Sequence, residues 1–170
     1  QGYLKQGNTL WFYDPQSRRF NSTSSTDRFQ NSNARNSDFT RSTLAEDYEI
    51  RAAEQTRLGR FDCWLLSLES TTDDVTYPKM KIWISDDGLI RKSEDYSLSG
   101  QLLRTTAVPE YHHIGDKFVP RKILIIDELR GARIDGTFRN ERTQITISKP
   151  SFKPLPDSVF SKNFLETVNR

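Results

Sequence analysis

An alternation of apolar and polar residues runs through most of the chain from Tyr48 to Ser148, and it constrains the fold more than any other feature. Turn signals containing Gly, Asp or Ser divide this region into strand-length segments, as expected for a succession of β-hairpins. The expected strands are Tyr48–Thr56, Phe61–Ser70, Lys79–Ser85, Leu89–Tyr96, Leu102–Val108, Glu110–Ile114, Phe118–Glu128 and Glu141–Ser148. Strands joined by short turns pair antiparallel, so the sequence predicts a mainly β domain built on an antiparallel sheet.

The expected strands Phe61–Ser70 and Lys79–Ser85 each place three large apolar side chains on one face. These side chains are Trp64, Leu66 and Leu68 on the first strand and Met80, Ile82 and Ile84 on the second. Side chains alternate along a strand, so the opposite face of Lys79–Ser85 carries Lys79, Lys81 and Trp83 and is mixed in character. A sheet with one apolar face packs either against other parts of its own chain or around an apolar ligand, and periodicity alone leaves both open. The residues that would line a site for such an apolar ligand are Trp11, Tyr13, Trp64, Leu66, Leu68, Met80, Ile82 and Ile84.

Two connections are longer than a tight turn. Gln16 to Thr43 is rich in Ser, Asn, Thr and Arg, with Phe20, Phe29 and Phe39 as widely spaced apolar anchors. It predicts a loop with one or two helical turns, one capped by Asn36 or Ser37 and another formed by Ser42 to Asp47. This loop is expected to lie over an opening of the sheet, either as a lid, binding loop or mobile segment or as a plain connection. In the last hairpin, Lys122–Leu129 is expected to pair with Glu141–Ser148, and residues 130–140 between them are expected to form a flexible tip with no assigned role.

Composition narrows the function classes. The 170 residues are enough for one domain, which we expect to cover residues 1–170. The formal charge of +2 comes from 25 basic and 23 acidic residues that are interspersed, without the basic block that favours nucleic acid. We therefore expect no nucleic-acid partner. The apolar runs are too short to span a bilayer, and the single cysteine, Cys63, leaves the redox compartment open.

Residue types that often serve in catalysis or metal binding are present, but not in the patterns that those functions require. His112 and His113 are neighbours on an expected strand and point to opposite faces, and neither the Asp73-Asp74 pair nor Asp86-Asp87-Gly88 continues as a calcium loop. Cys63 lies in an apolar strand, where a buried thiol is inert. The sequence therefore predicts a protein that is not an enzyme, with no catalytic residues, metal or cofactor.

The C-terminal segment combines a proline turn with an apolar stripe. After Pro154-Leu155-Pro156, Asp157 is expected to cap a short helix. The apolar residues of this helix are Val159, Phe160, Phe164 and Leu165. Such a helix either closes over the sheet as a lid or docks on a partner.

Five stretches together resemble the outer-membrane lipoprotein-sorting protein family, the LolA-like carriers, over nearly the whole chain. They are GNTLWFYDP (residues 7–15), NSDFTRSTLAEDYEI (36–50), TYPKMKIWI (76–84), EDYSLSGQLLRTT (94–106) and TQITISKPSFKPLPDSVFSKNFLE (143–166). The resemblance implies a curved antiparallel sheet that forms an incomplete, half-open β-barrel with short helices over its concave face. It also implies a periplasmic carrier or chaperone that binds lipoprotein acyl chains or envelope lipids for transfer to the outer membrane. The alternative is a non-enzymatic interaction module that partners an envelope lipid transporter of the resistance-nodulation-division type.

The start of the chain differs from that family. Strands are expected at Tyr3 to Lys5 and Thr9 to Tyr13, joined by a Gly7-Asn8 turn, whereas members of the family carry a signal peptide and further N-terminal strands before this point. We therefore expect the chain to represent the C-terminal two thirds of the family domain. A strand edge left unpaired in this way is expected to allow an edge-strand dimer.

Overall fold

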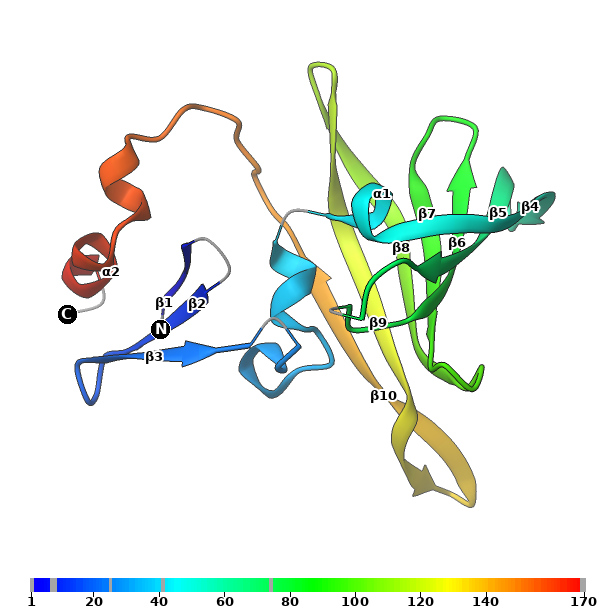
Figure 1. Ribbon diagram of the computed structural model, residues 1–170, viewed down its shortest axis with the longest axis horizontal. Helices are drawn as coiled ribbons and strands as arrows, with labels where there is room; N and C mark the ends of the chain where they lie inside the picture. Colours follow the sequence, from blue (N-terminus) through cyan, green and yellow to red (C-terminus); the bar gives the residue numbers. More distant parts are fainter. Residues whose placement is uncertain (1, 7–8, 25, 41, 74, 169–170) are drawn as a thin grey trace. The chain divides into compact units, whose positions relative to one another are not determined.

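The structure is a computed structural model that describes residues 2–6, 9–24, 26–40, 42–73 and 75–168 (Figure 1). The chain divides into two compact units, each described here by itself. The first comprises Gln1–Phe29, Arg35–Thr40 and Ser151–Arg170, and the second comprises Gln30–Ala34 and Arg41–Pro150. Whether both act as one domain over residues 1–170 stays a prediction. Among the described residues, no helix is long and apolar enough to cross a membrane.

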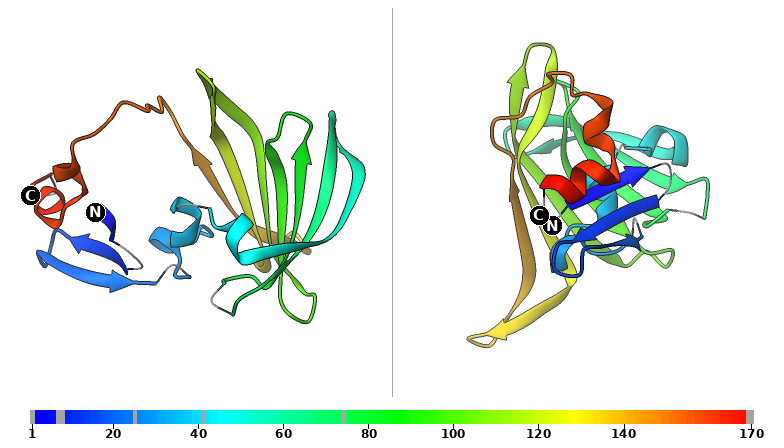
Figure 2. Two further views of the ribbon diagram at one scale, coloured as in Figure 1. Left: turned by 45° about the horizontal axis from the view of Figure 1, so that its top comes forward. Right: turned by 90° about the vertical axis from the view of Figure 1, so that its left-hand side faces the viewer.

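The second unit is built on a seven-stranded antiparallel sheet. Its strands are β4 (Tyr48–Leu58), β5 (Phe61–Ser70), β6 (Lys79–Ser85), β7 (Ile90–Tyr96), β8 (Leu102–Ile114), β9 (Lys117–Ile134) and β10 (Thr137–Thr146), preceded by the short helix α1 (Leu44–Asp47). The strands follow one another in space as they do in sequence, so β4 and β10 form the two edges. Figure 2 shows this sheet strongly curled without closing into a barrel. The predicted mainly β, half-open antiparallel fold is confirmed.

Strands β8, β9 and β10 are longer in the structure than expected. Leu102–Val108 and Glu110–Ile114 form one strand, β8, with a register shift between Ala107 and Glu110. The last hairpin does not end at Leu129: beyond a register shift, residues 131–134 pair with residues 137–140, and the connection shrinks to Asp135 and Gly136. Both residues have positive φ, 50° and 77°, as a two-residue type I′ turn requires.

The first unit contains a smaller antiparallel sheet in the order β1 (Gly2–Gln6), β2 (Thr9–Asp14) and β3 (Arg19–Thr23). The strands expected around Tyr3 and Thr9 are confirmed, whereas the expected Gly7-Asn8 turn lies outside the described residues. Strand β3 was missed: it lies within the segment expected to be loop, because only Phe20 among its residues is large and apolar. The edge-strand dimer stays a prediction.

Aromatic side chains form much of the core of the first unit. Tyr13 is 1% exposed and its ring lies 4.9 Å from that of Phe20. Phe29 lies between Tyr3 and Phe39, with ring centroids 4.8 and 4.5 Å apart. The three phenylalanines expected to anchor the long polar segment thus pack against aromatic neighbours.

The short helices only partly follow the sequence. Turn η2 (Asn36–Phe39) and helix α1 occur where helical turns were expected, but η2 is capped by Arg35, whose backbone N–H donates to Asp38 at 2.7 Å. The expected cap at Asn36 or Ser37 is therefore wrong. Asn36 is the first residue of the turn, and its side chain donates to the carbonyl of Ser24 at 2.7 Å.

The C-terminal helix is also interrupted. Asp157 begins the turn η3 (Asp157–Phe160) and does not cap it, and α2 (Lys162–Val168) starts separately. Ser161 has an extended backbone that ends the first turn, and its Oγ accepts a hydrogen bond from the backbone N–H of Phe164 at 3.2 Å. Val159 and Phe160 therefore lie on η3, and Phe164 and Leu165 on α2, so the single predicted stripe is split.

Candidate functional site

Six of the eight candidate lipid-lining residues lie on one face of the large sheet. They form three directly opposite pairs on β5 and β6: Trp64 with Ile84, Leu66 with Ile82, and Leu68 with Met80. The same face continues across β7 and β8 to Ile125 of β9, because Ile82 pairs with Ser93, Ser93 with Thr106, and Thr106 with Ile125. We call these six residues and Ile125 the apolar face.

Burial varies along the apolar face. Leu68, Ile82 and Ile125 are buried, and Leu66, Met80 and Ile84 are half-buried. Trp64 is 45% exposed, and Ile50, which pairs with Leu68 from β4, is 60% exposed. At the β10 side, Asn33 is buried and its backbone N–H donates to Thr143 Oγ1 at 2.9 Å. The exposed apolar area therefore lies toward β4 and β5.

The other two candidates lie on a different sheet. Trp11 and Tyr13 belong to β2 in the first unit, where Tyr13 is core. Lys162 of α2 places its Nζ 3.2 Å from the ring centroid of Trp11. Both residues therefore have partners within the first unit, and the structure does not bring them together with the other six on one sheet.

A charged pair interrupts the apolar face. Asp95 of β7 has none of its side chain exposed, and Arg104 of β8 donates from Nε to Asp95 Oδ2 at 2.6 Å. Arg104 also lies 4.8 Å from the ring centroid of Tyr77, whose carbonyl accepts the Tyr48 hydroxyl at 2.7 Å. Burial, and after it the charge of Asp95, raises the pKa of Tyr48 to about 12.

Sequence reasoning missed this charged pair, although a signal was present. Asp95 pairs with Met80, so its side chain lies on the face where the alternating pattern places apolar residues. A carboxylate at such a position needs a cationic partner, because burying it alone is costly. The alternation identifies the misplaced carboxylate but does not name Arg104 as its partner.

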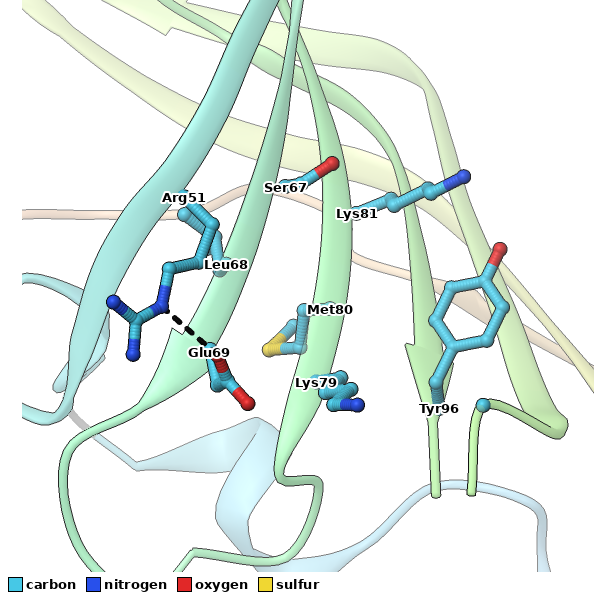
Figure 3. A pocket seen from close by; sticks show the side chains of 9 residues that line it. Arg51, Ser67, Leu68, Glu69, Lys79, Met80, Lys81 and Tyr96 are labelled. Atoms are coloured by element: carbon cyan, nitrogen blue, oxygen red, sulfur yellow. Dashed lines mark hydrogen bonds and ion pairs between the residues drawn. The ribbon is translucent and has the colours of Figure 1, made fainter. Parts of the chain in front are cut away.

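An open cavity of about 400 Å³ is lined mainly by residues of the opposite, mixed face, together with Leu68 and Met80. Figure 3 shows it with the ion pair between Arg51 Nε and Glu69, 2.8 Å long. Lys79 Nζ donates to the carbonyl of Leu98 at 3.1 Å, and Lys81 Nζ lies 5.8 Å from the Tyr96 ring centroid. The residues lining the cavity are Arg51, Ser67, Leu68, Glu69, Lys79, Met80, Lys81, Tyr96 and Gly100.

Electrostatics on this mixed face centre on Glu94. Its carboxylate accepts hydrogen bonds from Lys92 Nζ, at 2.6 Å, and from the Tyr96 hydroxyl. Burial by itself would raise the pKa of Glu94, but these two donors outweigh burial and hold that pKa below its ordinary value. Burial and the bond to Glu94 raise the pKa of Tyr96. The mixed face is thus cationic and aromatic, unlike the apolar face.

Other conspicuous polar residues have structural partners. His112 Nε2 lies 2.8 Å from the carbonyl oxygen of Ile147, and His113 stacks on Phe118. Cys63 is buried, and burial raises the pKa of its thiol. Within the described part of the chain, no three His, Cys, Asp or Glu side chains cluster as metal ligands would.

The residues predicted to form a lid or docking helix leave apolar surface exposed. Phe160 is 58% exposed and Phe164 is 40% exposed, whereas Val159 and Leu165 are half-buried. Helix α2 contacts β1 within the first unit. Their assignment as lid or docking residues stays a prediction.

Three solved structures share this architecture. A LolA superfamily protein from Nitrosomonas europaea is 24% identical, with 95% of this chain and 70% of that chain covered and a TM-score of 0.69. A putative outer membrane lipoprotein-sorting protein domain from Vibrio parahaemolyticus is 21% identical, with coverages of 93% and 66% and a TM-score of 0.78. A DUF1329 family protein from Desulfovibrio piger is 16% identical, with coverages of 95% and 66% and a TM-score of 0.71.

These likenesses establish the fold, and the chain spans about two thirds of the length of the three proteins. No curated protein matches the chain. A family model described as "Uncharacterized protein" matches residues 1–167. The chain therefore belongs to that uncharacterized-protein family, and its fold is the one seen in the LolA superfamily.

Proposed function

We propose that this protein is a carrier that binds the acyl chains of lipoproteins or envelope lipids on the apolar face. The observation that carries the proposal is the pairing of Trp64, Leu66 and Leu68 with Ile84, Ile82 and Met80 on one face, with Trp64 still partly exposed. An aliphatic and aromatic surface of this kind suits an acyl chain better than a polar ligand. The carrier acts in the periplasm and passes its cargo toward the outer membrane, a proposal supported by the fold it shares with a putative outer membrane lipoprotein-sorting protein domain.

The energetics of carriage favour a partly open face. Each buried methylene contributes about 0.8 kcal/mol, so a sixteen-carbon chain has a gross drive of about 12 kcal/mol to leave water. A closed pocket would recover nearly all of this free energy and retain the cargo. A face that buries Leu68 and Ile82 but leaves Trp64 and Ile50 exposed recovers only part of it, which permits release.

A second candidate function is an interaction module that docks on an envelope transporter of the resistance-nodulation-division type. The C-terminal segment favours it, because Phe152, Leu155, Phe160 and Phe164 are all exposed there. Exposed apolar groups gathered in one segment are typical of interaction sites. In this case acyl chains would not bind the apolar face, and loss of the exposed phenylalanines would abolish docking.

The chain contains a matched pair of reporters for the carrier. Trp64 lies on the apolar face and Trp83 on the mixed face of the neighbouring strand. Two single-tryptophan variants are needed, W11F/W83F and W11F/W64F. A brominated sixteen-carbon acyl methyl ester, which is uncharged, should quench Trp64 saturably and leave Trp83 largely unquenched. Equal quenching of both, or quenching of Trp83 alone, would refute binding on the apolar face.

Mass spectrometry of an organic extract then addresses the natural cargo. Stoichiometric acyl lipid from the natively purified protein supports the carrier and identifies the cargo class. L66E should lose that lipid, because a carboxylate on the apolar face is incompatible with an acyl chain. L65E, whose altered side chain is on the mixed face of the same strand, is the control and should retain the lipid.

A further inference from the structure

A second cavity lies on the mixed face, away from the six paired candidates. Its volume is about 330 Å³. Phe61 lies on the same face of β5 as Cys63, and Lys92 of β7 pairs with Trp83 of β6. Both side chains belong to the mixed face, so the cavity lies on that side of the sheet. The lining residues are Leu58, Gly59, Arg60, Phe61, Arg91, Lys92, Ala107, Val108 and Pro109. Most of the walls are apolar, and the only charged groups in the lining are cations.

Two register shifts on adjacent strands shape this cavity. Trp83 pairs with Lys92 and Ile84 with Ile90, so Arg91 is an extra residue in β7. A bulge of this kind re-aims a side chain, and bulges are frequent beside binding sites. On β8, the ladder breaks between Ala107 and Glu110, which leaves Val108 and Pro109 outside the regular pairing. Both bulged segments contribute lining residues.

The bulge at Arg91 buries a guanidinium beside the aromatic wall. Arg91 is only 8% exposed, and its Nε donates to Ser85 Oγ at 2.7 Å while Nη2 pairs with Asp87. Its guanidinium carbon lies 4.1 Å from the ring centroid of Phe61. Planar stacking of arginine on an aromatic ring is favourable when both are shielded from water, so Phe61 and Arg91 form a rigid wall.

The cavity has an uncompensated positive charge at Arg60. Asp87 neutralises Arg91, and Glu94 neutralises Lys92. Arg60, in the turn between β4 and β5, lies 5.0 Å from the centroid of Phe61, and no carboxylate of the described residues forms an ion pair with it. An exposed guanidinium beside an apolar hollow is complementary to a molecule with an anionic head and an apolar tail.

We propose that this cavity binds an amphiphile with a single anionic head group and a short acyl tail. Arg60 pairs with the head group, and Phe61, Ala107 and Val108 hold the tail. The volume is at the small end of ligand pockets and suits a tail shorter than that of a membrane lipid. This site is separate from the apolar face, so it does not depend on the proposed carrier function.

The test is calorimetric titration of the full chain with decanoate below its micelle concentration, with decyl phosphate and uncharged decanol in parallel. R60Q should weaken binding of both anions roughly fivefold, as loss of one partly exposed ion pair does, and leave decanol unchanged. R57Q is the control, because Arg57 belongs to the same hairpin, is exposed, and lies 3.8 Å from Asp62. It should change the affinity for decanoate less than twofold. The ratio of decanoate to decyl phosphate affinity identifies the preferred head group.

A cavity-filling variant completes the design. A107F places a ring in the hollow and should abolish the part of decanoate binding that depends on Arg60, with folding checked by thermal melting. The uncharged brominated ester should still quench Trp64 in A107F, so this proposal and the carrier proposal can fail independently. Decanoate binding in A107F that R60Q still weakens, or decanoate binding that R57Q and R60Q weaken equally, would overturn the proposal.

Discussion

Asp95 and Arg104 show how one residue pair can interrupt an apolar face without disrupting it. Both side chains lie on the same face as Met80, and Asp95 is fully buried. Burial removes water from the carboxylate, and the Arg104 Nε donor 2.6 Å away offsets that loss. The pair therefore fixes the neighbouring strands β7 and β8 in one register, since a one-residue slip would separate the two charges.

Removing one member of this pair should be costly. D95N removes the buried carboxylate charge that pairs with Arg104 Nε, and we expect it to lower the free energy of unfolding by about 3–5 kcal/mol. The apolar double variant D95L/R104M should cost less than D95N, because neither partner is left alone. Urea denaturation measures both.

The matched control for this prediction is D62N. Asp62 has a side chain that is 74% exposed and lies 3.8 Å from Arg57. Its loss should change the free energy of unfolding by about 0.5 kcal/mol or less. Similar small effects for D62N and D95N would show that Arg104 does not depend on Asp95.

Tyr48 gives a pH dependence that can be isolated. Its pKa is about 12 in the folded chain against an ordinary value of 10.0, so the folded state keeps the phenol proton to higher pH. The associated stability is fully present below pH 10 and is lost as the pH rises from 10 through about 12. Y48F should be less stable at pH 8 by about 1 kcal/mol, through loss of the bond to Tyr77. Between pH 9 and pH 11.5 it should lose less stability than the parent chain, and parallel curves in urea denaturation would contradict this origin.

At the scale of elements, the β9–β10 hairpin depends on Gly131. A Cβ at this position would lie 2.2 Å from the carbonyl oxygen of Arg139 and 2.8 Å from Cζ of Phe138. Gly131 pairs with Asn140, beside a register shift between Asn140 and Arg142. The Phe138 ring therefore covers a position where only hydrogen fits, and this close packing lets both strands extend beyond Leu129.

Replacing this glycine should disrupt the outer part of the hairpin. G131A forces the Arg139 carbonyl to move, and we expect a loss of about 1–3 kcal/mol in the stability of the hairpin. Hydrogen exchange should accelerate for residues 130–140 and stay unchanged in β5 and β6. T137A, on the exposed end of the same hairpin, is the control and should leave exchange as it was. Unaltered exchange in G131A would show that the hairpin tolerates a side chain there.

At the scale of the whole molecule, chain ends and chain middle belong to different units. The first unit is assembled from Gln1–Phe29, Arg35–Thr40 and Ser151–Arg170, so its core needs both ends of the chain. Lys162 connects them, because its Nζ lies 3.2 Å from the Trp11 ring and 5.4 Å from the Phe20 ring. The second unit has its own sheet and its own buried residues, including Ile82 and Ile125.

Deletion of residues 151–170 should therefore destabilise the first unit and leave the stability of the second unit unchanged. Hydrogen exchange should accelerate throughout β1, β2 and β3 and remain slow in β5 to β8. The variant K162M tests the contact with Trp11 alone and should have a smaller effect in the same strands. Faster exchange throughout β4 to β10 after the deletion would show that the second unit needs the C-terminal segment. Slow exchange in β1 to β3 would favour docking over packing as the role of η3 and α2.

The sequence by itself determined the antiparallel strands and, within β5 and within β6, which three large apolar residues share a face. Both follow from local rules: side chains alternate with a period of two, and a short turn sets the register of the next strand. Only the tertiary structure decided which residues meet across longer distances. It placed Trp11 and Tyr13 in a separate unit, made β3 from a polar segment, and paired Asp95 with Arg104. Such contacts depend on partners distant in the chain, and the pattern around a residue does not name its partner.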